Sequence, residues 1–530
     1  MKNKFFLYTL FASLVILATA CSDELESKYF NPEKSTEASI PGYFTRMLNN
    51  NRVRPSYWNV RTFLLMQPAV YTQTAFYSNS SSKYQESTSY TQQYWNNFYV
   101  GNSNGAGVLS HYKAMEVAYD ALSTDEQSTM DLFMNAGKVV LIDEASKMVD
   151  MWGDIPYSEA GSLETSSTID NAAFDDQVAL YTQFIADLDE VATYFSTATT
   201  SATFSKYDIL AGGSVDQWQR YANSLRLRLL MRISYYDEST AEADITEMLS
   251  NSDEYPLIDG SDNGDYSPSG SDILLEPLTD YTDNLNSALT ELPSHYASDY
   301  MLNTVMSPAD DPRIPVMYDK YGVTTSGTFT PNTDYAAMPI SYTETEVNNN
   351  YQKFAILDST TFLQNPDLPG IVMTASEVNF LKAEAYERWG GGDAESAYET
   401  AVKQSVTFYY YLNNLNSTGL TTVTKPSDST VDTFVADSNV AYSGTSDEKL
   451  AKIWTQKWVH FGFLQSIQAW SEYRRTGYPE LTFSDATLVG YETPPTRLMY
   501  PDDEKSYNST NYQAVQSEDT RDTKIFWDVK

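Results

Sequence analysis

Aromatic and amide side chains alternate along residues 71–100. Flat aromatic faces stack on sugar rings and side-chain amides bind hydroxyl groups, so this pattern is typical of a carbohydrate-binding surface. The predicted ligand contacts are Tyr71, Tyr77, Tyr84, Tyr90, Trp95 and Asn96. Trp95, Phe98 and Tyr99 also keep helical spacing, and for these three residues a core helix is the favoured interpretation.

The residue types offer little support for catalysis. The histidines His111, His295 and His460 are scattered and the single cysteine is Cys21, so neither a zinc site nor a cysteine nucleophile is expected. No glycine loop of a phosphate-binding type is present. A glycosidase needs only two carboxylates about 5 to 10 Å apart. With 71 acidic residues the sequence permits such a pair of carboxylates but does not identify one. We therefore predict no catalytic residue and no cofactor.

One acidic stretch begins like a calcium-binding loop. Asp259, Ser261, Asn263 and Gly264 match its start, but its twelfth position is Gly270, where a bidentate glutamate is required. An acidic turn is therefore the favoured interpretation, and no metal site is predicted. Whether a calcium ion binds near residues 259–265 stays open at this point.

Composition restricts the partners. With 34 basic and 71 acidic residues the chain carries a formal net charge of -37, which opposes binding to nucleic acid or to anionic membrane surfaces. Hydrophobic residues make up 42% of the chain and aromatic residues 14%, enough for a large core. The acidity therefore indicates a charged surface on a folded protein, and nucleic acid is not expected as a partner.

The first residues form a targeting segment. Lys2 and Lys4 precede an apolar run at residues 5–17 that is too short to span a bilayer, and small residues follow at 18–20. We predict a signal peptide over residues 1–20. Cys21 follows the cleavage point directly, where a bacterial lipoprotein presents its thiol for acylation, although an ordinary secretory site would be cut at the same bond. Residues 21–30 then form a lipid anchor and acidic linker.

The strongest helical signal lies at residues 451–481, where aromatic residues fill two stripes of one predicted helix. Thr445 and Glu448 form a capping box before it, and Gly477 and Pro479 end it. Because this helix is apolar around much of its circumference, we expect it to lie in the core. Core packing is favoured for its aromatic residues over a role in sugar stacking.

Further helices are predicted over residues 130–152, 178–195, 218–229 and 378–389, and Asp393 caps a helix that completes an αα-hairpin. Polar, glycine-containing stretches predict long loops at about 72–105, 251–290, 318–370 and 413–445. No linker divides the chain, so residues 31–530 are predicted to form a single domain. The arginines that we expect to pair with carboxylates of neighbouring helices are Arg220, Arg226, Arg228 and Arg232.

Five segments, in order along the chain, resemble the SusD/RagB family of nutrient-binding outer-membrane lipoproteins, in particular its SusD-like branch. They are WGDIPYSEA at 152–160, WQRYANSLRLRLLMRIS at 218–234, ASEVNFLKAEAYERWGGG at 375–392, QKWVHFGFLQSIQAWSEYRRTGYPEL at 456–481 and PPTRLMYPDDEKSYN at 494–508. The resemblance spans most of the mature chain.

This resemblance implies a mainly α fold, in which a tetratricopeptide-like scaffold of helical pairs carries long irregular loops and few short strands. It implies a surface-exposed lipoprotein of the outer membrane, with the acidic residues at 22–27 resembling an export signal. Such a protein binds a nutrient, here an oligosaccharide or other glycan, and delivers it to a SusC-like TonB-dependent transporter. The alternatives are a cell-surface glycoside hydrolase and a peptide-binding member of the same family.

Overall fold

The computed structural model describes residues 39–76, 82–101, 107–162, 168, 170–261, 265–277, 285–291, 295–483 and 487–530. Helices dominate this part of the chain, and its few strands are short, as predicted. The prediction of a mainly α fold is therefore confirmed. Residue Cys21 and the predicted signal peptide lie outside the described residues.

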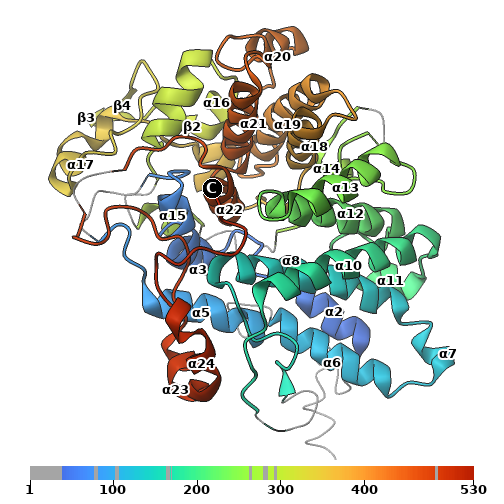
Figure 1. Ribbon diagram of the computed structural model, residues 1–530. Helices are drawn as coiled ribbons and strands as arrows, with labels where there is room; N and C mark the ends of the chain where they lie inside the picture. The colour runs from blue at the N-terminus through green and yellow to red at the C-terminus, as the bar shows by residue number, and fades with distance from the viewer. Residues whose placement is uncertain are drawn as a thin grey trace, which may run out of the picture.

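The helices of the first half of the chain lie in successive rows, with α2 and α6 on one side of α8 and with α12 and α13 on the other (Figure 1). The long helices α8, α10 and α12 pack one against the next, and α12 also contacts α13 and α18. The elements are α2 Ile40–Leu48, α3 Tyr57–Asn59, η1 Val60–Leu64, α4 Pro68–Tyr71, α5 Thr88–Tyr99, α6 Val108–Asp120, α7 Thr124–Gln127, α8 Asp131–Trp152, α10 Gln177–Thr197, α11 Ala202–Tyr207, α12 Val215–Ile233 and α13 Glu238–Ser250.

The second half continues this succession of paired helices, because α18 packs on α19 and α21, and α21 packs on α22. Stacked pairs of this kind are consistent with the tetratricopeptide-like scaffold. The helical elements are α14 Pro268–Ser271, α15 Leu285–Thr290, η3 Tyr300–Met306, η4 Ser307–Ala309, α16 Ile314–Met317, α17 Glu344–Asn350, η5 Tyr351–Lys353, η6 Ser359–Leu363, α18 Ala375–Trp389, α19 Ala394–Asn414, α20 Asp428–Val435, α21 Ser446–Phe461, α22 Ser466–Thr476, α23 Asp502–Tyr507, α24 Ser509–Val515 and η7 Gln516–Glu518.

The strands form three antiparallel two-stranded sheets among the described residues. Strand β1 Ile273–Leu275 pairs with β6 Gly370–Met373, β2 Tyr318–Asp319 pairs with β5 Ile356–Leu357, and β3 Gly322–Thr325 pairs with β4 Thr328–Pro331. The predicted loops are therefore only partly irregular. Stretch 72–105 contains α5, 318–370 contains most of the strands, and 413–445 contains α20. The polar composition of these stretches gave no prediction of the helices and strands that they contain.

The prediction of one helix over residues 451–481 is wrong. The helix is interrupted at Gly462, between α21 and α22. This glycine has φ 49°, and a Cβ there would lie 2.7 Å from the hydroxyl oxygen of Tyr409. The predicted boundaries are confirmed. Thr445 and Glu448 form a reciprocal capping box, and Gly477 ends α22 with φ 76°.

The αα-hairpin of α18 and α19 is confirmed. The hydroxyl of Thr374 accepts a hydrogen bond from the backbone N–H of Glu377 and so caps α18. The carboxylate of Asp393 accepts from the N–H of Ser396 at 3.0 Å and caps α19. Side-chain caps satisfy amides that have no partner within the helix, so these local signals fix where each helix begins.

One hydrophobic core runs from Ile40 to Trp527. Residues 525–528 contribute to this core. Trp527 is fully buried, and its indole N–H donates a hydrogen bond to the Asp150 carboxylate at 3.0 Å. Ion pairs run through the same core. The predicted pairing with carboxylates of neighbouring helices is confirmed for three arginines, by Arg226–Asp189, Arg228–Glu377 and Arg232–Asp150. It is wrong for Arg220, which pairs with Asp216 of its own helix α12.

Candidate ligand-binding groove

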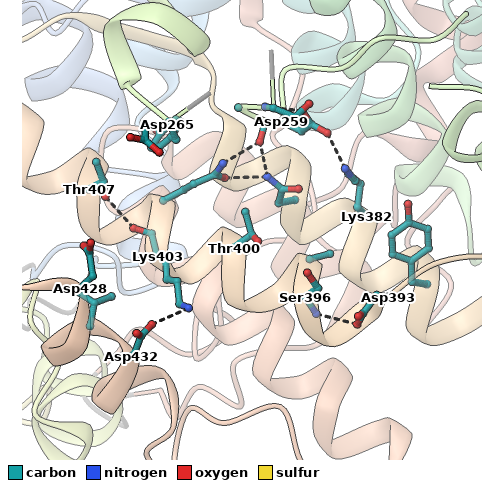
Figure 2. Close-up of a pocket in the computed structure, with 18 of the residues that line it drawn as sticks. Asp259, Asp265, Lys382, Asp393, Ser396, Thr400, Lys403, Thr407, Asp428 and Asp432 are labelled. Atoms are coloured by element: carbon teal, nitrogen blue, oxygen red, sulfur yellow. Dashed lines mark hydrogen bonds and ion pairs between the residues drawn. The ribbon is translucent and has the colours of Figure 1, made fainter. Parts of the chain in front are cut away.

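A groove lies between the α18–α19 hairpin, α20 and a loop wall of residues 259–261 and 265–266 (Figure 2). Its cavity volume is about 930 Å³, within the ~300–1,000 Å³ typical of ligand sites. We call it the polar groove. Its lining residues are Asp259, Gly260, Ser261, Asp265, Tyr266, Asn379, Lys382, Tyr386, Asp393, Ser396, Ala397, Thr400, Lys403, Gln404, Thr407, Lys425, Asp428, Val431 and Asp432.

The loop wall of the polar groove is tied to both helices of the hairpin through Asp259. Its carboxylate pairs with the Lys382 ammonium at 2.7 Å, and its backbone carbonyl accepts hydrogen bonds from Asn379 and Gln404, each at 2.8 Å. The amide of Asn379 also donates to Gln404 Oε1 at 2.9 Å. The loop is therefore held on a rigid support, which lowers the entropic cost of ligand binding.

The charge of Asp259 is fixed by these neighbours. Burial would raise the pKa of this carboxyl, but the Lys382 ammonium and hydrogen bonds from Lys382 and Ser261 outweigh burial and lower the pKa below its usual value. The next residue, Gly260, has φ 78°, and a Cβ there would lie 2.7 Å from Gln404 Nε2 and 2.9 Å from the Tyr266 ring. Only glycine permits this close turn.

The opposite wall carries two more lysines in ion pairs. Lys403 on α19 pairs with Asp432 of α20 at 2.8 Å (Figure 2). Lys425 pairs with Asp428 at 3.0 Å. Each lysine of the groove thus has a carboxylate partner. Such paired charges keep hydrogen-bonding capacity for hydroxyl groups without leaving a lone ammonium to attract an anion.

Two tyrosines supply the aromatic surface of the groove. The hydroxyl of Tyr266 donates to Asp272 at 2.8 Å, which fixes its ring beside Gly260. The ring of Tyr386 packs over the reversal after α18, where a Cβ on Gly392 would lie 2.3 Å from it. The groove therefore combines aromatic faces with hydroxyl, amide and carboxylate groups, the combination that sugar recognition requires.

Metal chemistry finds no support in the described part of the chain, where no group of three or more His, Cys, Asp or Glu side chains is arranged to hold an ion. The Asp259 carboxylate of the calcium-like stretch is occupied by Lys382 and by the Ser261 hydroxyl. Asn263 and Gly264 lie outside the described residues. The geometry at Asp259 is that of an acidic turn closed by a lysine.

Five of the six residues predicted as ligand contacts, Tyr71, Tyr84, Tyr90, Trp95 and Asn96, lie outside the polar groove. Tyr71, Tyr84 and Trp95 are at most 1% exposed, which corrects their prediction as ligand contacts, because no ring face is open to a sugar. Their rings pack in the core, where Tyr71 lies 5.2 Å from Trp470 and Trp95 lies 5.2 Å from Trp152. Trp95 belongs to α5, so the favoured interpretation of a core helix is confirmed for it.

The other three candidates have different outcomes. Tyr90 and Asn96 are half-buried on α5, and the Tyr90 ring meets Trp58 edge-on at 6.1 Å. Both residues stay predictions as ligand contacts. Tyr77 lies outside the described residues.

The groove residues that the sequence analysis missed do carry a signal. Polar side chains recur along one face of α19 at helical spacing, namely Ser396, Thr400, Lys403, Gln404 and Thr407. A polar stripe on a helix usually faces water, so it predicts exposure and not a site. Nothing in the sequence places residues 259–266 against that stripe, because the two segments lie more than 100 residues apart.

Among the described residues, no helix is both long enough and apolar enough to cross a bilayer.

No curated protein matches the chain. Three similar solved structures share the fold. One is a chitin-binding protein, with 23% identity, TM-score 0.73 and coverage of 93% of this chain and 100% of the other. Another is a chitin-binding SusD homologue from Flavobacterium johnsoniae, with 22% identity, TM-score 0.66 and coverage of 93% and 99%. The third is a SusD homologue from Bacteroides uniformis, with 19% identity, TM-score 0.69 and coverage of 93% and 100%.

A family model provides the assignment. The model described as "Starch-binding associating with outer membrane" matches residues 32–501, which is most of the chain. The five resembling segments, the mainly helical fold and this match agree, and the protein belongs to the SusD-like family.

Proposed function

We propose that this protein binds an oligosaccharide at the outer face of the outer membrane and passes it to a SusC-like TonB-dependent transporter without converting it chemically. The observation that carries the proposal is the polar groove, whose walls offer tyrosine faces, hydroxyls and amides on a rigid helical hairpin. Two similar structures are described as chitin-binding, which supports a glycan as the ligand.

The groove suits an uncharged, hydroxyl-rich ligand. Amides donate hydrogen bonds to sugar hydroxyls and accept them, carboxylates accept them, and Lys382, Lys403 and Lys425 are already neutralised by aspartates. The cavity is large enough for several sugar units because ligand sites of ~300–1,000 Å³ bury drug-sized molecules. Open polar sites of this kind bind with dissociation constants of about micromolar to millimolar.

The lowered pKa of Asp259 argues against this carboxyl as the general acid of a glycosidase. A glycosidase needs one carboxyl group that keeps a proton at neutral pH in order to protonate the leaving oxygen. Lys382 instead favours the ionised form of Asp259. Hydrolysis of an oligosaccharide by the purified protein would contradict the proposal.

Filling the groove should weaken binding. Thr400 lies exposed on α19 in the groove wall, so Thr400→Trp adds an indole to the cavity without disturbing the core. We expect at least a tenfold loss of affinity, about 1.4 kcal/mol, in calorimetric titration with chitin or starch oligosaccharides.

The matched control is Thr193→Trp, at an exposed threonine of α10 away from the groove lining. This variant should bind as the unaltered protein does. If the Thr400→Trp protein binds with the same affinity as the unaltered protein, the polar groove is not the binding site. If the unaltered protein binds peptides and no glycan, the peptide-binding alternative is favoured.

Delivery to a transporter depends on the predicted anchor. A lipid on Cys21 confines the protein to the membrane that holds its transporter, which raises the effective concentration of one for the other. Cys21→Ala should move the protein from the membrane fraction to the soluble fraction, as measured by fractionation and immunoblotting. Retention of the Cys21→Ala protein in the membrane fraction would contradict lipidation. Cys21→Ser, which also removes the thiol, should behave in the same way.

A further inference from the structure

A second, smaller cleft lies on another part of the scaffold, between η3, α21 and the turn at residues 478–480. Its volume of about 240 Å³ is below the ~300–1,000 Å³ of sites that bury whole ligands, so it suits one part of a longer molecule. Its lining residues are Tyr300, Thr304, Val305, Asn439, Ala451, Lys452, Thr455, Gln456, Tyr478, Pro479 and Glu480. We call it the tyrosine cleft.

The two tyrosines of this cleft rest on neighbouring tryptophans of α21. The Tyr300 ring meets Trp458 edge-on with centroids 6.1 Å apart, and the Tyr478 ring lies 5.3 Å from Trp454. The tryptophans are four positions apart in the sequence, which places them on one face of the helix about 6 Å apart along its axis. Tyr300 and Tyr478 are therefore adjacent members of one aromatic row.

The support beneath the tyrosines is rigid. Trp458 is 3% exposed and its indole N–H donates to the carbonyl of Thr72 at 3.0 Å. Trp454 is 5% exposed and lies under Tyr478. Tyr300 and Tyr478 themselves are only half-buried, so each keeps ring surface open to the cleft. Aromatic faces held in place before binding lose little entropy when a ligand stacks on them.

Polar groups surround this row. The Lys452 ammonium is bound by the carbonyls of Ala441, at 2.7 Å, and Ser443, at 3.3 Å. Glu480 is exposed at the edge of the cleft. The Tyr300 hydroxyl is a hydrogen-bond donor at neutral pH, and burial and then the charge of Glu480 raise its pKa further. The edge thus offers an acidic acceptor and a tyrosine donor.

We propose that the tyrosine cleft is a second carbohydrate-binding site, which holds one or two rings of an uncharged glycan against Tyr300 and Tyr478. The proposal rests on the proposed function, because it needs a glycan as the ligand. An uncharged ligand is favoured since the lining holds one carboxylate, Glu480, and one ammonium, Lys452, whose charges balance, while the net charge of -37 on the chain repels carboxylated or sulfated sugars. Two sites on one chain would increase retention on a polymer through multivalency.

The test is retention of the full-length protein, purified in detergent, on insoluble chitin and insoluble starch. Tyr300→Ala removes a stacking face, and we expect about tenfold weaker retention on whichever polymer retains the unaltered protein. Tyr300→Phe keeps the ring and should restore most of the retention. Tyr507→Ala is the matched control, because Tyr507 is 75% exposed on α23 and lies outside both sites.

The outcomes separate the two proposals. If the unaltered protein is retained and Tyr300→Ala and Tyr478→Ala are retained equally well, the tyrosine cleft is not a binding site, while the proposed function stands. If the unaltered protein is retained on neither polymer, both proposals fail. Stronger retention of the unaltered protein on polygalacturonate than on the neutral polymers would contradict the proposal that the ligand is an uncharged glycan. Thermal unfolding of each variant must match the unaltered protein, so that lost retention is not lost folding.

Discussion

Replacement of Glu384 by alanine is expected to lower the free energy of unfolding by about 3–5 kcal/mol. Glu384 lies on α18 and is fully buried. Both its oxygens accept hydrogen bonds from the Arg475 guanidinium at 2.7 Å, and Lys457 lies 3.6 Å away. Burial alone would raise the pKa of Glu384, but Arg475 and Lys457 lower it to about 2. Without this carboxylate, Glu472 is left to balance both cations.

Equilibrium unfolding in urea measures this loss. The matched control is Glu238→Ala, because Glu238 also pairs with an arginine of α18, at 2.9 Å, but is 60% exposed. An exposed pair contributes about 0–1 kcal/mol, so this control should unfold close to the unaltered protein. Equal effects of the two replacements would show that burial of the charge network does not determine its contribution.

Replacement of His460 by glutamine should flatten the dependence of stability on pH below about 6.5. His460 is 1% exposed on α21, and its ring nitrogens lie 2.7 Å from the Thr374 hydroxyl and 3.0 Å from the Ser405 hydroxyl. Burial, and then the positive charge of Arg313, lowers the pKa of His460 to about 3. The imidazole therefore stays neutral in the folded state.

The direction of the effect follows from proton binding. Between about pH 6.5 and pH 3 the unfolded chain binds a proton at His460 and the folded chain does not. The stability that neutral His460 provides is fully present above pH 6.5 and is lost as the pH falls, by up to about 1.4 kcal/mol per pH unit. The glutamine variant lacks this loss, so its unfolding free energy should approach or exceed that of the unaltered protein at pH 4.

Urea unfolding of both proteins at several pH values isolates this contribution. The remaining ionisable groups are common to both, including Glu86 and Asp358, whose pKa burial raises to about 7, so they cancel in the difference. His111→Gln is the control, because that ring is only partly buried on α6. Parallel curves for His460→Gln and the unaltered protein would contradict a buried neutral imidazole.

Local chemistry in the sequence predicts where the helices begin and end. The capping box of Thr445 and Glu448, the cap at Asp393 and the end at Gly477 all depend on neighbours within a few residues. The break at Gly462 was missed because aromatic residues continue at helical spacing on both sides of it. A single glycine among periodic residues does not distinguish an interrupted helix from a continuous one.

The binding surfaces could be predicted only by type of residue. Tyrosine suits both sugar stacking and core packing, so composition alone does not separate Tyr84, which is buried, from Tyr300, which lines a cleft. What separates them is the segment that covers each ring. Phe483 packs against Tyr84, about 400 residues away in the sequence, and such long-range contacts have no local signal.

The insertion of Trp527 beneath Asp150 links folding to the order of synthesis. Asp150 is 3% exposed and lies in α8, so its environment is completed by a residue that leaves the ribosome several hundred residues later. A polypeptide released before residue 525 would present an uncovered carboxylate and apolar helix faces to chaperones and proteases. Chains that end before residue 525 should therefore be degraded faster than the full-length chain.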